Sequence, residues 1–197
     1  GSRTPTKRQP AVAANHLRCS VSSQNYFELF NFPQTFALDT HLLEARWRQL
    51  AGQVHPDRFA NATAAEKRVA MQWASTINEA YRVLKQPLAR ARYLCELAGC
   101  DLQTESNTRM DGDFLMRQMA WREALDEAKS AGQPEAFAAL DTEIEEAIAD
   151  MQRHVAALID EQNDASAAAA KVREWMFLDK LLSEIQVAKH ELADRNQ

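Results

Sequence analysis

Apolar residues recur at intervals of three and four along most of the chain, which is the spacing of an amphipathic α-helix. In the first half this pattern predicts a helix over residues 38–54 and a second that begins at Thr63 and ends before Pro87. The expected buried faces comprise Leu43, Trp47, Leu50 and Val54 in the first helix, and Val69, Trp73, Ile77, Ala80 and Leu84 in the second. Two apolar faces of similar length joined by a short loop pack as an antiparallel hairpin.

Shorter elements flank this hairpin. Residues 25–33, "NYFELFNFP", predict one or two helical turns with their aromatic side chains directed inward. Residues 87–99, "PLARARYLCELAG", predict a further helix, with Gly99 in the position of a C-terminal cap. The turn-rich residues that follow, 100–113, mark the boundary between two domains.

Three longer amphipathic segments complete the chain. They extend over residues 113–130, 135–163 and 165–192, with breaks at 132–134 and 163–164. Short breaks between long amphipathic helices predict an antiparallel three-helix bundle. The predicted fold class is therefore all-α, with a hairpin domain over residues 26–100, a connector over 101–112 and a bundle over 113–197.

Composition supports this reading, because the chain has only 5 Gly and 6 Pro and is rich in good helix formers. No run of apolar residues approaches the length that spans a membrane, so we expect no membrane insertion. The 3 cysteines, Cys19, Cys95 and Cys100, are an odd number, which favours a reducing compartment over a disulfide framework. They lack the spacing of zinc ligands, and we expect no metal and no cofactor.

The N-terminal residues 1–25 differ from the rest. Gly1 and Ser2 resemble a cloning scar, and the remainder carries Arg3, Lys7, Arg8 and Arg18 but no acid. We interpret the segment as a disordered tail, and we expect a cytoplasmic protein of bacterial type. An organelle transit peptide has a similar composition, and would instead place the protein in the mitochondrial matrix.

Charge is distributed unevenly within a net charge of −5. Residues 40–93 contain nine Lys or Arg against four acids, whereas residues 123–164 contain twelve acids against two bases. The first half should therefore attract an acidic partner. Nucleic acid is not the expected partner, because the basic residues are not interleaved with exposed aromatic residues. The acidic run over residues 141–150 is best interpreted as a solvated helix face.

The loop of the hairpin carries His55, Pro56 and Asp57, followed by Arg58. A His with an Asp two positions away can serve as a general base with an orienting carboxylate, or as two metal ligands. An enzyme would also need a nucleophile and an oxyanion site, and a metal site would need a third ligand. The sequence contains no motif for a nucleophile, an oxyanion site or a third metal ligand. The remaining interpretation is a turn, enforced by Pro56, that projects two polar side chains for contact with a partner.

This loop and its surroundings resemble the J-domain of the DnaJ co-chaperone family. The resemblance rests on Tyr26 and Leu29, on the His55-Pro56-Asp57 loop, and on "INEAYRVLKQPLARARY". It implies that the loop docks on a DnaK-type chaperone and stimulates its ATP hydrolysis, so that the protein itself is not an enzyme. His55, Pro56 and Asp57 would make the required contacts. Arg46 and Arg48 would belong to a basic helix face, with Arg58 beside the loop.

The rest of the chain is similar to one branch of that family, the HscB-type co-chaperones of iron–sulfur cluster assembly. The similar segments are "PLARARYLCELAG", "TESNT", "DFLMRQMAWREALDEA" and "KVREWMFLDKLL". The resemblance covers about residues 25–194 and implies that the bundle binds an IscU-type scaffold protein and hands it to an HscA-type ATPase. The Gly/Phe-rich linker and CxxCxGxG repeats of general J-proteins are absent. A general DnaJ-like co-chaperone, without scaffold specificity, is the alternative.

Helical geometry identifies a candidate for the scaffold-binding surface. At 100° per residue, Leu115 and Met119 lie off the stripe expected to be buried in the first bundle helix. Phe177 is similarly displaced in the third helix. Geometry alone leaves open whether these side chains form a second packing face or an exposed patch. The resemblance to HscB-type proteins places scaffold contacts at all three positions.

Overall fold

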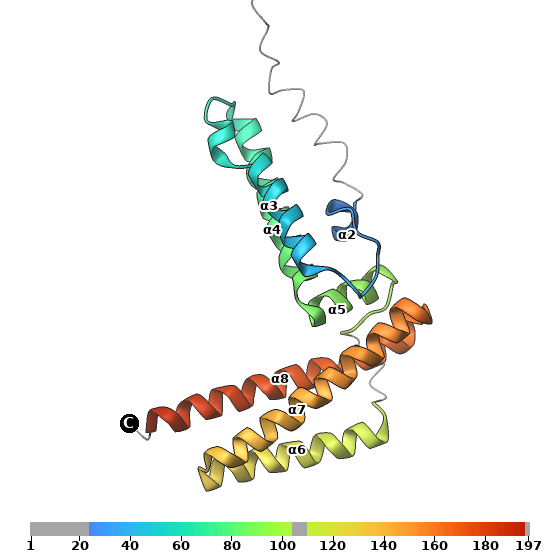
Figure 1. The fold of residues 1–197 in the computed structure, drawn as a ribbon, viewed down its shortest axis with the longest axis vertical. Coiled ribbons are helices and arrows are strands. Elements are labelled where there is room, and N and C mark those ends of the chain that lie inside the picture. Colours follow the sequence, from blue (N-terminus) through green and yellow to red (C-terminus); the bar gives the residue numbers. More distant parts are fainter. Residues whose placement is uncertain (1–23, 104–109, 196–197) are drawn as a thin grey trace, which may run out of the picture. The chain divides into compact units, whose positions relative to one another are not determined.

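The computed structural model describes residues 24–103 and 110–195, and every regular element in these ranges is helical (Figure 1). These residues form two compact units. The first contains the described residues up to Gln34 together with Leu38–Gln86, and the second contains Thr35–Ala37 and the described residues from Pro87 onward. The predicted all-α class is confirmed, whereas the predicted domain boundaries stay a prediction. The tail expected over residues 1–25 falls almost entirely outside the described residues, as do Cys19 and the "TESNT" segment.

The first unit contains the predicted hairpin. Its elements are α2 (Tyr26–Leu29), α3 (Thr40–Gln53), the 3-10 turn η1 (Pro56–Phe59) and α4 (Ala64–Lys85). Helices α2 and α4 both begin at capping boxes, formed by Asn25 with Glu28 and by Thr63 with Glu66. The carboxylate of Asp39 accepts two backbone N–H groups at the start of α3. Side chains therefore satisfy the free N–H groups at each of these helix starts.

Helices α3 and α4 pack along the faces that the sequence predicts. The indole of Trp47 stacks on the ring of Tyr81 with a centroid separation of 4.5 Å. The indole N–H of Trp47 also donates to Asn78 Oδ1 at 2.9 Å. The buried side chains of the predicted faces are Leu43, Val54, Trp73, Ile77, Ala80 and Leu84. These contacts hold α3 and α4 together on either side of the connecting loop.

The second unit contains α5 and the three-helix bundle. Its elements are α5 (Pro87–Leu97), α6 (Gly112–Ala131), α7 (Pro134–Ala156), the π-turn η3 (Ala157–Glu161) and α8 (Ala165–Arg195). Gly132 has a φ of 61° and ends α6, since its N–H donates to the carbonyl of Ala128. The bundle agrees with the prediction except at the end of the second helix. The sequence predicts an α-helix up to residue 163, but the chain widens into π geometry after Ala156.

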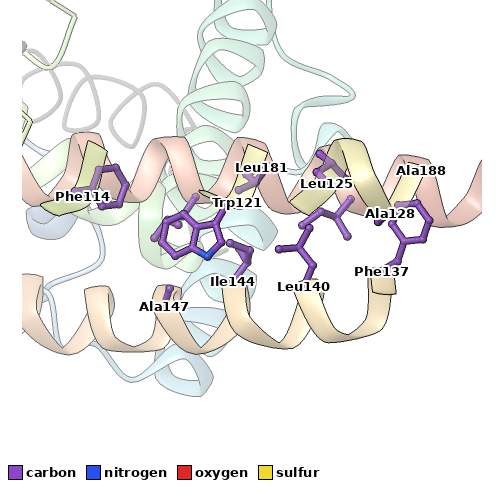
Figure 2. Close-up of a cluster of buried hydrophobic side chains, with 12 residues drawn as sticks. Phe114, Trp121, Leu125, Ala128, Phe137, Leu140, Ile144, Ala147, Leu181 and Ala188 are labelled. Carbon is purple, nitrogen blue, oxygen red and sulfur yellow. The ribbon is translucent and has the colours of Figure 1, made fainter. Parts of the chain in front are cut away.

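The bundle core is formed by one side of each long helix (Figure 2). The buried cluster comprises Phe114, Trp121, Leu125, Ala128, Phe137, Leu140, Ile144, Ala147, Leu178, Leu181, Ile185 and Ala188. The indole nitrogen of Trp121 faces α7 and donates to Glu143 Oε1 at 2.8 Å (Figure 2). Because a buried indole N–H needs an acceptor, this bond fixes the rotation of α6 about its own axis.

The π-turn presents the carboxylate of Asp160 to a segment far away in the sequence. Its oxygens accept the backbone N–H groups of Phe36 and Ala37 at 2.7 and 2.9 Å. The ring of Phe36 also meets Trp175 edge-on at 6.2 Å, and the guanidinium of Arg90 lies 4.9 Å from its centroid. Burial lowers the pKa of Arg90 and the nearby Asp160 opposes this shift. These contacts explain why residues 35–37 belong to the second unit.

Helix α5 ends in a Schellman motif that brings two cysteines together. The N–H of Cys100 donates to the carbonyl of Cys95, and that of Gly99 to the carbonyl of Glu96, both at 2.9 Å. Gly99 adopts a φ of 80°, the left-handed conformation that this motif requires. Cys95 is buried, and burial raises the pKa of its thiol to about 11. Cys100 is half-buried.

The Asp160 contacts predict a local change in hydrogen exchange. Replacing Asp160 with Ala leaves the amides of Phe36 and Ala37 without their acceptor, and a hydrogen bond to a charged group contributes about 1.5–3 kcal/mol. We expect these two amides to exchange roughly tenfold faster or more, as measured by NMR. Asp164→Ala is the control, because Asp164 accepts the N–H of Ala167 instead. Equal exchange in wild type and Asp160→Ala would contradict the assigned contacts.

The raised pKa of Cys95 predicts slow alkylation. At pH 7.5 a thiol with a pKa of about 11 is ionised in only about one molecule in three thousand, and the thiolate is the reactive form. Iodoacetamide should therefore label Cys100 before Cys95 in the native protein, and the Cys95 rate should rise as the pH approaches 11. Both residues should react at similar rates in denaturant. Equal labelling of the native protein at pH 7.5, read by peptide mass, would refute the burial argument.

Candidate functional site

The loop between α3 and α4 is held by its own hydrogen bonds. Pro56 occupies the first position of η1, and the His55 ring caps this turn, because its Nδ1 accepts the backbone N–H of Asp57 at 3.3 Å. The carbonyl of His55 accepts the N–H of Arg58 at 3.0 Å. Proline at the first helical position fixes the backbone in the required conformation. The three residues therefore form a preorganised turn.

Both polar side chains of this turn face solvent. The side chain of His55 is 60% exposed and that of Asp57 is 91% exposed, with 3.5 Å between His55 Nδ1 and Asp57 Oδ2. A neutral ring that accepts a hydrogen bond at Nδ1 carries its proton at Nε2. The turn thus offers a partner one N–H donor and one carboxylate. Such exposure suits contact with another macromolecule, whereas a catalytic His–Asp pair relies on a protected geometry.

The three arginines predicted to act with this loop lie in different surroundings. Arg48 is exposed and pairs with Glu44 one turn earlier on α3. Arg58 is exposed within η1, directly after Asp57. Arg48 and Arg58 thus carry accessible charge in the first unit. Their contact with a partner stays a prediction.

Arg46 is engaged inside the first unit. Its Nη1 donates to the carbonyls of Phe30 and Asn31, both at 2.8 Å, and its guanidinium lies 4.4 Å from the ring centroid of Phe32. Asn31 adopts a φ of 56°, a left-handed conformation that this contact helps to hold. Arg46 therefore ties α3 to the segment after α2. A role in partner contact stays a prediction for this residue too.

The second candidate surface lies on α6. Leu115 is 45% exposed and Met119 is 73% exposed, so neither packs as a central core residue. Met116, which the sequence analysis does not single out, is 72% exposed. The same helical geometry places Met116 about 160° from Phe114, almost opposite the buried stripe. We call Leu115, Met116 and Met119 the α6 patch.

Phe177 lies in the seam between α6 and α8. Its ring meets that of Phe114 edge-on at 6.0 Å, and the guanidinium of Arg122 lies 5.3 Å from its centroid. Arg122 also forms an ion pair with Glu184 on α8, and this hydrogen bond lowers the pKa of the Glu184 carboxyl. Phe177 is therefore half-buried, with part of its surface still accessible to solvent.

Phe177 and the α6 patch are neighbours by helical geometry. Phe114 and Arg122, which flank Phe177, are eight residues apart and lie on the α8 side of α6. Leu115 lies about 20° from Arg122 around the helix, and Met119 about 60° from it. The patch therefore begins at the α6–α8 seam and extends outward across the exposed face of α6.

In the described ranges, none of the helices combines the length and the apolar character that crossing a membrane requires. Within residues 24–103 and 110–195, no group of three or more His, Cys, Asp or Glu side chains is arranged so that it could hold a metal ion.

Comparison with known proteins identifies relatives over most of the chain. A profile described as the HSCB C-terminal oligomerisation domain matches residues 110–186. The co-chaperone protein HscB homolog of Bordetella pertussis is 56% identical over 169 residues, which cover 86% of this chain and 98% of that protein. The homolog from Azoarcus sp. is 46% identical over 165 residues, or 84% of this chain and 93% of that protein.

Solved structures agree with these relatives. Chaperone HscB from Vibrio cholerae matches with a TM-score of 0.75 and 36% identity, covering 86% of this chain and 99% of that one. Human co-chaperone HscB matches with a TM-score of 0.78 and 26% identity, covering 84% of this chain and 82% of that one. With its helical hairpin, its bundle and this degree of identity, the chain belongs to the HscB family of co-chaperones, which join an N-terminal J-domain to a C-terminal helical bundle.

Proposed function

We propose that this protein links an iron–sulfur scaffold protein to a chaperone ATPase. The His55-Pro56-Asp57 turn docks on a DnaK- or HscA-type chaperone and stimulates its ATP hydrolysis. The α6 patch, with Phe177, binds an IscU-type scaffold and delivers it to that chaperone, which aids cluster transfer and protein maturation. The observation that carries the proposal is that a member of the HscB family exposes the His55-Pro56-Asp57 turn in one unit and the α6 patch in the other.

The geometry of the turn supports the chaperone contact. Its backbone is already fixed by Pro56 and by the hydrogen bonds of His55, so docking costs little conformational entropy. The exposed Arg48 and Arg58 carry positive charge in the same unit. They would steer an acidic chaperone surface toward the turn and raise the rate of association.

The composition of the α6 patch supports the scaffold contact. Monomeric proteins expose single apolar side chains routinely, but three within five residues on one helix form a contiguous surface. Methionine side chains are unbranched and polarisable, and they adapt to the shape of a partner. The half-buried ring of Phe177 would add an aromatic contact beside the α6–α8 seam.

The place of action that we propose is the bacterial cytoplasm. The HscB homologs of Bordetella pertussis and Azoarcus sp. described above are bacterial proteins. Within the described residues, Cys95 and Cys100 are free thiols even though the Schellman motif brings them together, which suits a reducing compartment.

Replacing His55 with Gln should weaken the protein's ability to stimulate the chaperone. The substitution removes the ring that caps η1 and that offers the outward N–H. We expect half-maximal ATPase stimulation to require at least about tenfold more protein, which corresponds to about 1.4 kcal/mol of lost binding. The measurement is steady-state ATP hydrolysis by an HscA-type chaperone and, in parallel, by a housekeeping DnaK-type chaperone.

His41→Gln is the matched control, because His41 is exposed at the opposite end of α3. It should stimulate like wild type. Equal stimulation by His55→Gln and wild type would contradict docking through the turn. Stimulation of the housekeeping chaperone alone, together with no affinity for the scaffold, would favour a general DnaJ-like function.

Replacing both Leu115 and Met119 with Ala should weaken scaffold binding. Truncating two apolar contacts near the centre of an interface costs about 2 kcal/mol or more, which is roughly thirtyfold in Kd. Isothermal titration calorimetry with an IscU-type scaffold measures this directly. Phe177→Ala is a less clean variant, since the ring packs on Phe114 and its loss also removes core contacts.

Val187→Ala is the matched control for this pair, because Val187 is an exposed apolar residue of α8 outside the patch. It should bind the scaffold with unchanged affinity. If the Leu115 and Met119 variant also keeps wild-type affinity, the scaffold site lies elsewhere on the bundle.

A further inference from the structure

The six methionines of the chain divide into two groups by exposure. Met110 and Met151 pack against the bundle core, and Met176 is half-buried. By contrast Met71, Met116 and Met119 are 71%, 72% and 73% exposed. An oxidant in solution therefore reaches the thioethers of this second group first, because oxidation follows access to the sulfur.

Two of the exposed methionines lie together on the α6 patch. Met116 and Met119 are three residues apart on one helix, so their side chains are neighbours on its surface. The third, Met71, lies on α4 in the other unit. The chain thus contains an equally exposed methionine outside the patch, which serves as an internal reference.

We propose that Met116 and Met119 are sites of reversible sulfoxidation by a peroxide, and that this modification releases the scaffold. The second part rests on the proposed function of the α6 patch. The sulfur lone pair attacks one oxygen of hydrogen peroxide, the O–O bond breaks, and a proton transfer releases water. The sulfur is oxidised by two electrons, the peroxide is reduced, and the product is one sulfoxide and one water. Methionine sulfoxide reductases reverse the change.

The modification converts the apolar patch into a polar one. A sulfoxide oxygen is a strong hydrogen-bond acceptor, and a partner that covers it without a donor must remove its water. Free in solution, the same oxygen remains hydrated, since both side chains project from the surface. Oxidation should therefore leave the fold intact and weaken only the complex, by about tenfold in Kd.

The His55-Pro56-Asp57 turn contains no sulfur, because residues 55–58 are His, Pro, Asp and Arg. In the absence of scaffold, peroxide-treated protein should therefore stimulate the chaperone ATPase as strongly as untreated protein. Scaffold-dependent stimulation should require about tenfold more scaffold. The modification would thus separate the two contacts of one protein, which a general loss of folding would not do.

The test treats the full chain with hydrogen peroxide and then with dithiothreitol, which reverses reversible cysteine oxidation but not methionine sulfoxide. Peptide mass mapping follows each methionine over time, and calorimetry measures scaffold affinity before treatment, after treatment and after methionine sulfoxide reductase. Met71→Leu and the double variant Met116→Leu with Met119→Leu are each compared with their own untreated samples. Thermal melts check that the treated proteins remain folded.

We expect Met71, Met116 and Met119 to be oxidised before Met110 and Met151. Treated wild type and Met71→Leu should each lose about tenfold in scaffold affinity and recover it with the reductase, while the double variant loses none. Oxidation of all six methionines at one rate would overturn the assignment of the site. Two results would overturn the proposed effect of oxidation on scaffold binding. One is unchanged scaffold affinity of wild-type protein that is oxidised at Met116 and Met119. The other is an equal loss of scaffold affinity in the treated double variant. If the untreated wild-type protein does not bind the scaffold, both the proposed function and the proposed release of the scaffold by oxidation are wrong. The order in which the methionines are oxidised then still tests whether Met116 and Met119 are the sites of modification.

Discussion

The burial of one side of α6 determines what the rest of that helix can do. Phe114, Trp121 and Leu125 face the bundle core, and the bond from the Trp121 indole to Glu143 prevents α6 from rotating about its axis (Figure 2). With this side fixed, the geometry of the helix leaves Leu115, Met116 and Met119 facing solvent. The exposed patch is therefore a consequence of how the core packs, and its position is as rigid as the core itself. A rigid apolar surface loses little entropy when a partner covers it.

A second, independent constraint shapes the turn between α3 and α4. There the fixed elements are a proline, a ring nitrogen that accepts a backbone N–H, and a short 3-10 turn. The stacked Trp47 and Tyr81 hold the two helices together and so position the turn at their connection. His55 and Asp57 are mostly exposed, which suits the chaperone contact proposed for them. In each unit, local packing thus determines which side chains of the proposed contact surface are exposed.

Sequence periodicity predicts the helices and their buried faces well, because burial of an apolar stripe is a local property that repeats along the chain. It predicts side-chain chemistry between distant segments poorly. Nothing in the spacing of Arg46 indicates that it binds the carbonyls of Phe30 and Asn31, and nothing near Asp160 indicates that it holds residues 35–37. Sequence periodicity also misses the π-turn after Ala156. Its Asp160 carboxylate accepts backbone N–H groups that lie more than one hundred residues away in sequence. Met116 is different, because the helical geometry that finds Leu115 and Met119 also finds it.

If the protein delivers the scaffold to the chaperone, the two proposed contact surfaces must belong to one molecule. The most direct measurement is scaffold-dependent ATPase stimulation by an equimolar mixture of two variants, His55→Gln and the Leu115 and Met119 double Ala variant. Each carries one intact surface. If the protein works by delivering the scaffold to the chaperone, the mixture stimulates no more than the two variants measured singly. Recovery of wild-type, scaffold-dependent stimulation by the mixture would contradict the account, because it would show that the two contacts act without a physical link.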